Sequence, residues 1–151
     1  MDYRVNVFVD HTFLFALYLE STNTPRAKEL LDSLYLRFPR PKLYTTNLEV
    51  IRTITKVYKE SKSNKRQSAI DCQNRIISSN VIKVRMIDRA VFHQTLEEFK
   101  KKELENFTGE LLELSSCIFI RENSELNIKE YYGFHSDVAF LSGYMGFQYY
   151  N

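Results

Sequence analysis

Glycine is scarce in this sequence, with only four residues, at positions 109, 133, 143 and 146. This spacing cannot form the G-x-G-x-x-G turn of a dinucleotide site or the P-loop that cradles nucleotide phosphates. The G-x-S-x-G elbow of serine hydrolases is missing as well. We therefore expect neither a dinucleotide-dependent oxidoreductase, nor an NTPase, nor a serine hydrolase.

Cysteines and long apolar runs are also lacking. Cys72 and Cys117 stand far apart without the spacing of a metal site, so we expect reduced thiols in the core of a cytoplasmic protein rather than a disulfide. No apolar run approaches the roughly 18 residues of a membrane span. Because the first apolar segment begins close to Met1, we expect no signal peptide either.

The residues that are present indicate a well-packed α/β protein. Apolar residues make up 44% of the 151 positions, with ten Tyr and eleven Phe, so we expect one domain over residues 1–151. Short β-branched and aromatic runs alternate with segments of helical periodicity, which predicts a three-layer α/β/α fold around a mainly parallel sheet of four or five strands. The predicted strands are 5–9, 43–44, 81–87, 128–134 and 147–150, and the longest predicted helix runs from 88 to about 105.

Three carboxylates follow predicted strands at the points where helices begin. Asp10 ends the first strand, Glu49 follows the second, and Asp137 follows the fourth. Each has a purely structural explanation, because Asp10 and Asp137 suit helix N-termini and Thr46 with Glu49 matches a capping box. Their recurrence at the carboxyl ends of strands, where ligands collect in open α/β sheets, favours a single crevice. Clustered carboxylates imply a cation, and an all-oxygen set suits Mg²⁺ or Mn²⁺.

The charge is unevenly distributed along the chain. Between Arg37 and Arg89 there are thirteen basic and four acidic residues, a net charge of +9, although the whole chain carries only +2. Charged helix faces are often merely solvated, but an excess of this size favours a polyanion such as nucleic acid.

Four segments together resemble the PIN-domain nucleases, and most of all the VapC-type toxins and their single-domain archaeal relatives. They are V-F-V-D-H-T-F-L-F-A-L near the start, T-T-N-L-E-V, L-S-S-C-I-F-I, and F-H-S-D-V-A-F near the end. The resemblance implies a metal-dependent ribonuclease in which Asp10, Glu49 and Asp137 hold Mg²⁺ or Mn²⁺. It implies that Thr12 orients ligands and water beside that site. A cognate antitoxin is a further partner that it implies.

One position departs from the family pattern. The family usually has Asp just inside the late helix, where this chain has Ser116. A hydroxyl can orient water but supplies no charge, so Ser116 is assigned to the surroundings of the metal. Glu113 lies three residues earlier, and it either leans into the site or precedes the helix and takes no part. The alternative function is therefore a non-catalytic PIN-fold module that binds RNA or a protein, with its metal site decayed at Ser116.

The remaining assignments concern the histidines, the RNA-binding surface and assembly. We expect His11 and His135 to donate to carboxylates or contact phosphate, with a zinc site as the less favoured alternative. Arg52, Lys56 and Lys59, on the helix that begins beside Glu49, are the candidates for gripping the RNA backbone. A homodimer is expected, and a structural subunit that dimerises through its Tyr-rich C-terminus is a third possible function.

Overall fold

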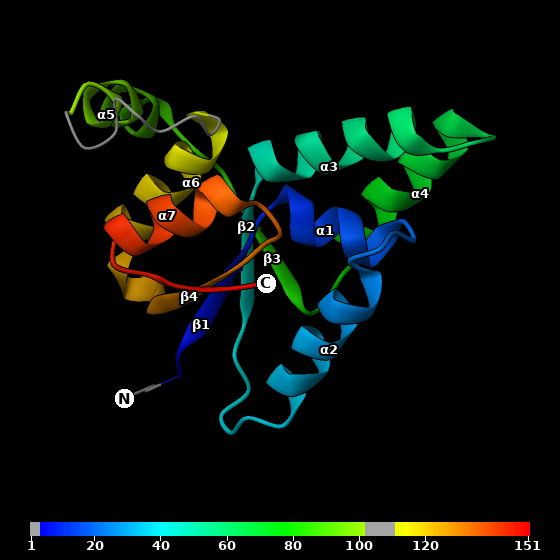
Figure 1. The fold of residues 1–151 in the computed structure, drawn as a ribbon, viewed down its shortest axis with the longest axis horizontal. Coiled ribbons are helices and arrows are strands. Elements are labelled where there is room, and N and C mark those ends of the chain that lie inside the picture. The colour runs from blue at the N-terminus through cyan, green and yellow to red at the C-terminus, as the bar shows by residue number, and fades with distance from the viewer. Residues whose placement is uncertain (1–3, 102–110) are drawn as a thin grey trace.

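The computed structural model describes residues 4–101 and 111–151, and its centre is a parallel β-sheet (Figure 1). Within these residues the sheet has five strands in the order β3-β2-β1-β4-β5, and every neighbouring pair is parallel. The strands are β1 (Asn6–Val9), β2 (Leu43–Thr46), β3 (Ile82–Arg85), β4 (Ile128–Tyr132) and β5 (Gln148–Tyr150).

Helices cover both faces of this sheet, which confirms the predicted three-layer α/β/α fold (Figure 1). One side carries α1 and α2, with α3 and α4 packed farther out against α1, and the other side carries α5, α6 and α7. The helices in the described part of the chain are α1 (His11–Tyr18), α2 (Thr24–Tyr35), α3 (Asn47–Glu60), α4 (Lys65–Ile77), α5 (Arg89–Phe99), α6 (Leu111–Glu122) and α7 (Ser136–Tyr144), with a short 3₁₀ turn, η2 (Ser124–Leu126). The helix predicted from 88 to about 105 is observed as α5, which already ends at Phe99; residues 102–105 lie outside the described part.

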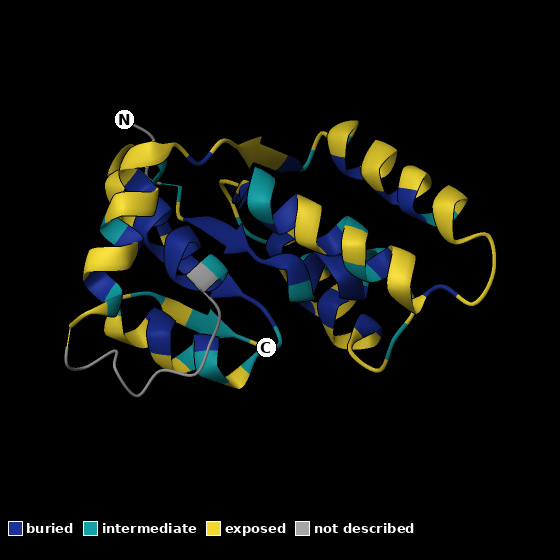
Figure 2. Ribbon diagram, turned by 90° about the horizontal axis from the view of Figure 1, so that it is seen from above, coloured by how far each residue is buried: buried dark blue, intermediate teal, exposed yellow. Residues whose placement is uncertain are grey.

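The alternation of side chains along β1 explains how two hydrophobic layers form. Val7 and Val9 point into the cluster with α1 and α2. Phe8 points into the cluster with α5, α6 and α7. Successive side chains of a strand face opposite sides of the sheet, so a continuous apolar strand is what a sheet covered on both faces requires. Figure 2 shows the central strands buried and the outer sides of the helices exposed.

The outer helices, α3 and α4, each bury only a narrow stripe of their apolar side chains. Val50, Val57 and Ile76 are buried among α1, α3 and α4, but Ile51 and Ile77 are 60% and 66% exposed. These two helices pack on each other and on α1 rather than on the sheet, so each has only one covered side. The strand predicted over 81–87 is shorter, and beyond Ile82 it is exposed at the sheet edge.

The order of the strands creates a switch point between β1 and β4. From β1 the chain continues through α1 and α2 to β2 on one side, whereas from β4 it continues through α7 to β5 on the other. The connections therefore leave the carboxyl ends of two adjacent strands in opposite directions, and a crevice for ligands forms at such a point. Within residues 4–101 and 111–151, no helix combines the length and apolar character that a bilayer crossing needs.

Candidate metal centre

Asp10 follows β1; it caps α1 and also faces the crevice. Its Oδ1 accepts hydrogen bonds from the backbone N–H groups of Thr12 (2.9 Å) and Phe13 (3.1 Å), so it caps α1 as its structural explanation predicted. Its Oδ2 accepts from the Tyr131 hydroxyl of β4 (3.0 Å). Asp10 is fully buried, and burial followed by the charge of Glu49 raises its pKa.

Gly133, directly after β4, lets this carboxylate lie against the backbone. A Cβ atom at position 133 would lie 2.5 Å from Asp10 Oδ2. The close approach of the backbone to a buried side chain therefore requires glycine here.

Replacing Gly133 by Ala is expected to lower stability by about 1–3 kcal/mol, because the added methyl group must displace a carboxylate held by several hydrogen bonds. Urea unfolding measures the change. Gly143→Ala in α7 is the matched control, since a Cβ there has nothing within 4 Å and alanine favours a helix. A Gly133→Ala protein as stable as the wild type would contradict the tight packing around Asp10.

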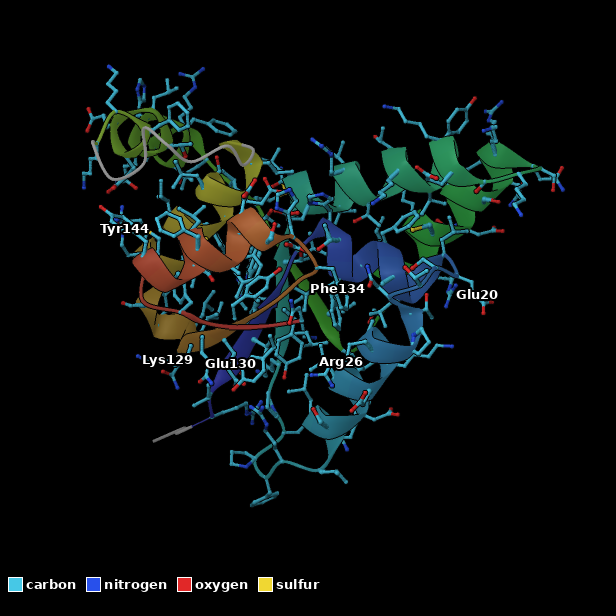
Figure 3. The ribbon with its side chains drawn as sticks, viewed as in Figure 1. Glu20, Arg26, Lys129, Glu130, Phe134 and Tyr144 are labelled. Atoms are coloured by element: carbon cyan, nitrogen blue, oxygen red, sulfur yellow. The ribbon has the colours of Figure 1, made fainter. Side chains whose placement is uncertain are left out.

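Thr12 ties the ends of β1 and β4 together. Its hydroxyl donates to Asp10 Oδ1 (2.5 Å) and accepts from the backbone N–H of Phe134 (2.8 Å). Figure 3 labels Phe134, which lies beside the start of α1. Asp137 is three residues further, half-buried in the first turn of α7. Thr12 thus supports Asp10, and Asp137 begins a helix at the same edge of the sheet.

Glu49, in the first turn of α3, links that helix to two others. Its backbone N–H donates to Thr46 Oγ1 (3.3 Å), as in a capping box. Its side chain, however, joins two other helices: Oε2 accepts from the backbone N–H of His11 (2.7 Å), and Oε1 accepts from Ser116 Oγ of α6 (2.7 Å). A capping role alone does not explain these contacts of a fully buried carboxylate.

Glu113 is the acid that the sequence left undecided, and it lies inside α6, in the first turn. It therefore does not precede the helix. Its side chain is 1% exposed, and among residues 4–101 and 111–151 neither carboxylate oxygen has a hydrogen-bond partner. Burial, and after it the charge of Glu49, raises the pKa of Glu113 to about 8. Since Glu113 and Ser116 are three residues apart, they lie on one face of the helix.

His11 completes the cluster. Its Nδ1 lies 2.9 Å from Glu49 Oε2 and 3.3 Å from Glu113 Oε1. Burial lowers the pKa of His11, but the hydrogen bond and the charge of Glu49 outweigh burial and raise it overall. One ligand atom from each of His11, Glu49 and Glu113 lies within 4.8 Å of the other two. We name these three residues the buried cluster.

The buried cluster and Asp10 fit a divalent cation. Burial, and after it repulsion from Glu49, raises the pKa values of Asp10 and Glu113, and a single imidazolium balances only one negative charge. The unsatisfied oxygens of Glu113 provide ligands without another use. In the described part of the chain, the group of possible ligands within 4.8 Å of one another consists of His11, Glu49 and Glu113 and does not include Asp137. The role of Asp137 as a ligand therefore stays a prediction.

The proposed RNA-binding side chains all come from α3, which begins at the site. Arg52 and Lys59 are exposed, whereas Lys56 is half-buried. The Nζ atom of Lys56 lies 4.4 Å from the centre of the Phe15 ring, so this residue also stabilises the contact between α1 and α3.

Comparison with solved structures places this architecture among PIN-like, VapC-type folds. VapC20 of Mycobacterium tuberculosis, described as a Sarcin-Ricin loop cleaving toxin, is 20% identical with a TM-score of 0.73, and the match covers 90% of this chain and 95% of VapC20. PAE2754 from Pyrobaculum aerophilum is 15% identical with a TM-score of 0.60, covering 96% of this chain and 89% of PAE2754. No family model and no curated protein sequence matches the chain. The likeness therefore establishes the fold, as the resemblance of the four segments predicted.

Proposed function

We propose that this protein is a metal-dependent ribonuclease that hydrolyses phosphodiester bonds of RNA. The observation that carries the proposal is the buried group of carboxylates at the switch point of a PIN-like fold, where the oxygens of Glu113 have no hydrogen-bond donor among the described residues. That VapC20, with the same fold, is described as a Sarcin-Ricin loop cleaving toxin supports RNA as the substrate class.

In this proposal Asp10, Glu49, Glu113 and Asp137 hold the ion, which is Mg²⁺ or Mn²⁺. The ion supplies positive charge to the reacting phosphate and makes water a better nucleophile. The protein's own groups keep the carboxylates in place: Thr12 and Tyr131 donate to Asp10, and Ser116 donates to Glu49.

The geometry weakens the argument for a decayed site. That alternative depends on the missing acid at Ser116, but Glu113 brings a carboxylate to within 3.3 Å of His11 from one helical turn earlier. The same helix therefore contributes both the charge of Glu113 and the hydroxyl that Ser116 donates to Glu49. A retuned site accounts for both contacts, and for this reason we favour it over a decayed one.

A cleavage assay tests the proposal. The purified protein is expected to cut single-stranded RNA when Mn²⁺ or Mg²⁺ is added and to leave it intact in a chelator. A preparation that binds millimolar Mn²⁺ but cuts neither single-stranded nor hairpin RNA would overturn the assignment as a ribonuclease and favour the non-catalytic module.

We also propose that α3 grips the RNA backbone. Reversing the charges of Arg52 and Lys59 together (Arg52→Glu with Lys59→Glu) should weaken binding and flatten its salt dependence, because each phosphate contact contributes a log–log slope near −0.7 for single strands. Binding is measured by fluorescence anisotropy in chelator, so that the RNA stays intact. Lys56 is left unchanged because of its contact with Phe15.

Lys129→Glu is the control for this experiment. Lys129 is exposed on β4 and lies away from α3, as Figure 3 shows. A double variant that binds RNA with the affinity and salt slope of the wild type would remove α3 from the RNA-binding surface.

A cognate antitoxin, a homodimer and a cytoplasmic location stay predictions. Light scattering of the purified chain tests the dimer.

A further inference from the structure

His11 is a buried histidine whose ring faces carboxylates and not only apolar side chains. It is the first residue of α1, directly after Asp10, and is 5% exposed. Its Nδ1 atom faces two carboxylates from different helices, Glu49 of α3 at 2.9 Å and Glu113 of α6 at 3.3 Å. A ring nitrogen thus lies among the oxygens that the proposed ion would use.

These distances match two kinds of bonding. A ring N–H that donates to a carboxylate gives about 2.9 Å. Two ligands bound side by side to one octahedral ion, each at about 2.1 Å, are separated by about 3.0 Å. The separations of 2.9 and 3.3 Å alone therefore do not decide between a hydrogen bond and shared coordination.

The hydrogen bonds of the two carboxylates favour coordination. Glu49 already accepts at both oxygens without the ring, from the His11 backbone N–H (2.7 Å) and from Ser116 Oγ (2.7 Å). Glu113 is 1% exposed, and no donor in the described part of the chain forms a hydrogen bond with either of its oxygens. If the His11 ring served only as a hydrogen-bond donor, we would expect its shorter contact to be with Glu113, which lacks donors among the described residues. Its shorter contact is instead with Glu49. A cation between the three side chains satisfies Glu113 and uses the ring nitrogen as well.

We propose that His11 Nδ1 is a ligand of the bound ion together with Glu49 and Glu113, and that this mixed nitrogen and oxygen set favours Mn²⁺ over Mg²⁺. Both ions bind carboxylate oxygens, but Mn²⁺, as a transition-metal ion, accepts an imidazole nitrogen beside them more readily than Mg²⁺ does. The inference rests on the proposed function in so far as the ion is the one that serves RNA cleavage. It goes beyond that function by assigning a nitrogen ligand and a preference between metals.

The test is a spectroscopic measurement on Mn²⁺ bound to the intact protein. Electron spin-echo modulation is expected to show ¹⁴N coupling from a directly bound nitrogen. The coupling should change to that of ¹⁵N in protein made with ¹⁵N-labelled histidine, which needs no substitution. In His11→Gln the nitrogen signal should be lost, and Mn²⁺ affinity should fall by at least the roughly 10- to 100-fold typical of damaged metal surroundings. Mg²⁺ affinity should change much less.

His93→Gln is the matched control, because His93 is exposed on α5; it should keep both the signal and the affinity. Bound Mn²⁺ without nitrogen coupling in the wild type would overturn the proposal and leave the ribonuclease function standing. Nitrogen coupling in a protein that cuts no RNA would support the proposal while the function fails. A wild type that binds no Mn²⁺ at millimolar concentration would overturn both.

Discussion

Glu49→Gln is expected to lower RNA cleavage by a factor on the order of 10²–10³, the range found when one group that stabilises transition-state charge is removed. Glutamine has the shape of glutamate and keeps an acceptor for the His11 backbone N–H or for Ser116, but it lacks the charge that attracts an ion. The rise in melting temperature with Mn²⁺ should disappear as well. In the wild type this stabilisation is about 2.7 kcal/mol at a hundred times the dissociation constant.

Glu60→Gln provides the comparison for this variant. Glu60 is the last residue of the same helix and is exposed, so its loss should change neither cleavage nor the response to Mn²⁺. Circular dichroism of both variants checks that α3 is intact. If Glu49→Gln cuts RNA at the rate of the wild type, Glu49 is a structural cap and not part of a catalytic metal centre.

The fold was predictable from sequence because its signals are local. The apolar run of β1 followed by Asp10 indicates a buried strand that turns into a helix, and the same pattern recurs before Glu49. The exposure of Ile51 and Ile77 was not predictable, because helical periodicity gives the direction of a side chain but not what covers it. Whether α3 and α4 pack on the sheet or on each other is decided by the tertiary structure.

The site was predictable only in part for a related reason. Asp10 and Glu49 stand out because each follows a strand, and the carboxyl ends of these two strands lie at one edge of the sheet. Glu113 lies in the first turn of α6, and no predicted strand comes directly before it, so its position along the chain left its role undecided. The signal that points to it is its spacing of three residues from Ser116, which places both on one helical face. His11 was predicted to meet a carboxylate, and its contact with Glu49 agrees with that expectation.

The metal-free protein is expected to lose stability as the pH rises from about 4.5 to about 8, and Glu113 should be a main cause. Its pKa is raised from 4.5 to about 8 in the folded protein, so within this window the native state binds a proton that the unfolded state has released. The contribution of Glu113 to the free energy of unfolding is therefore fully present below its pKa in the unfolded chain. It is lost as the pH rises through its pKa in the folded protein. A shift of this size corresponds to an effect on the order of 3–5 kcal/mol.

Urea unfolding at several pH values in chelator measures this slope, and Glu113→Gln should flatten it, because an amide is neutral throughout. At pH 8 the variant should be more stable than the wild type without metal, yet gain less stability from Mn²⁺, because the ion needs the charged carboxylate that glutamine lacks. Glu97→Gln, at an exposed position on α5, should keep the slope of the wild type. The raised pKa of Asp10 acts in the same direction, so some slope should persist in Glu113→Gln. An unchanged slope in Glu113→Gln would show that burial of Glu113 does not cause the loss of stability at high pH. If the variant is instead more stable than the wild type without metal and less stabilised by Mn²⁺, the buried carboxylate of Glu113 is destabilising by itself and serves to bind a cation.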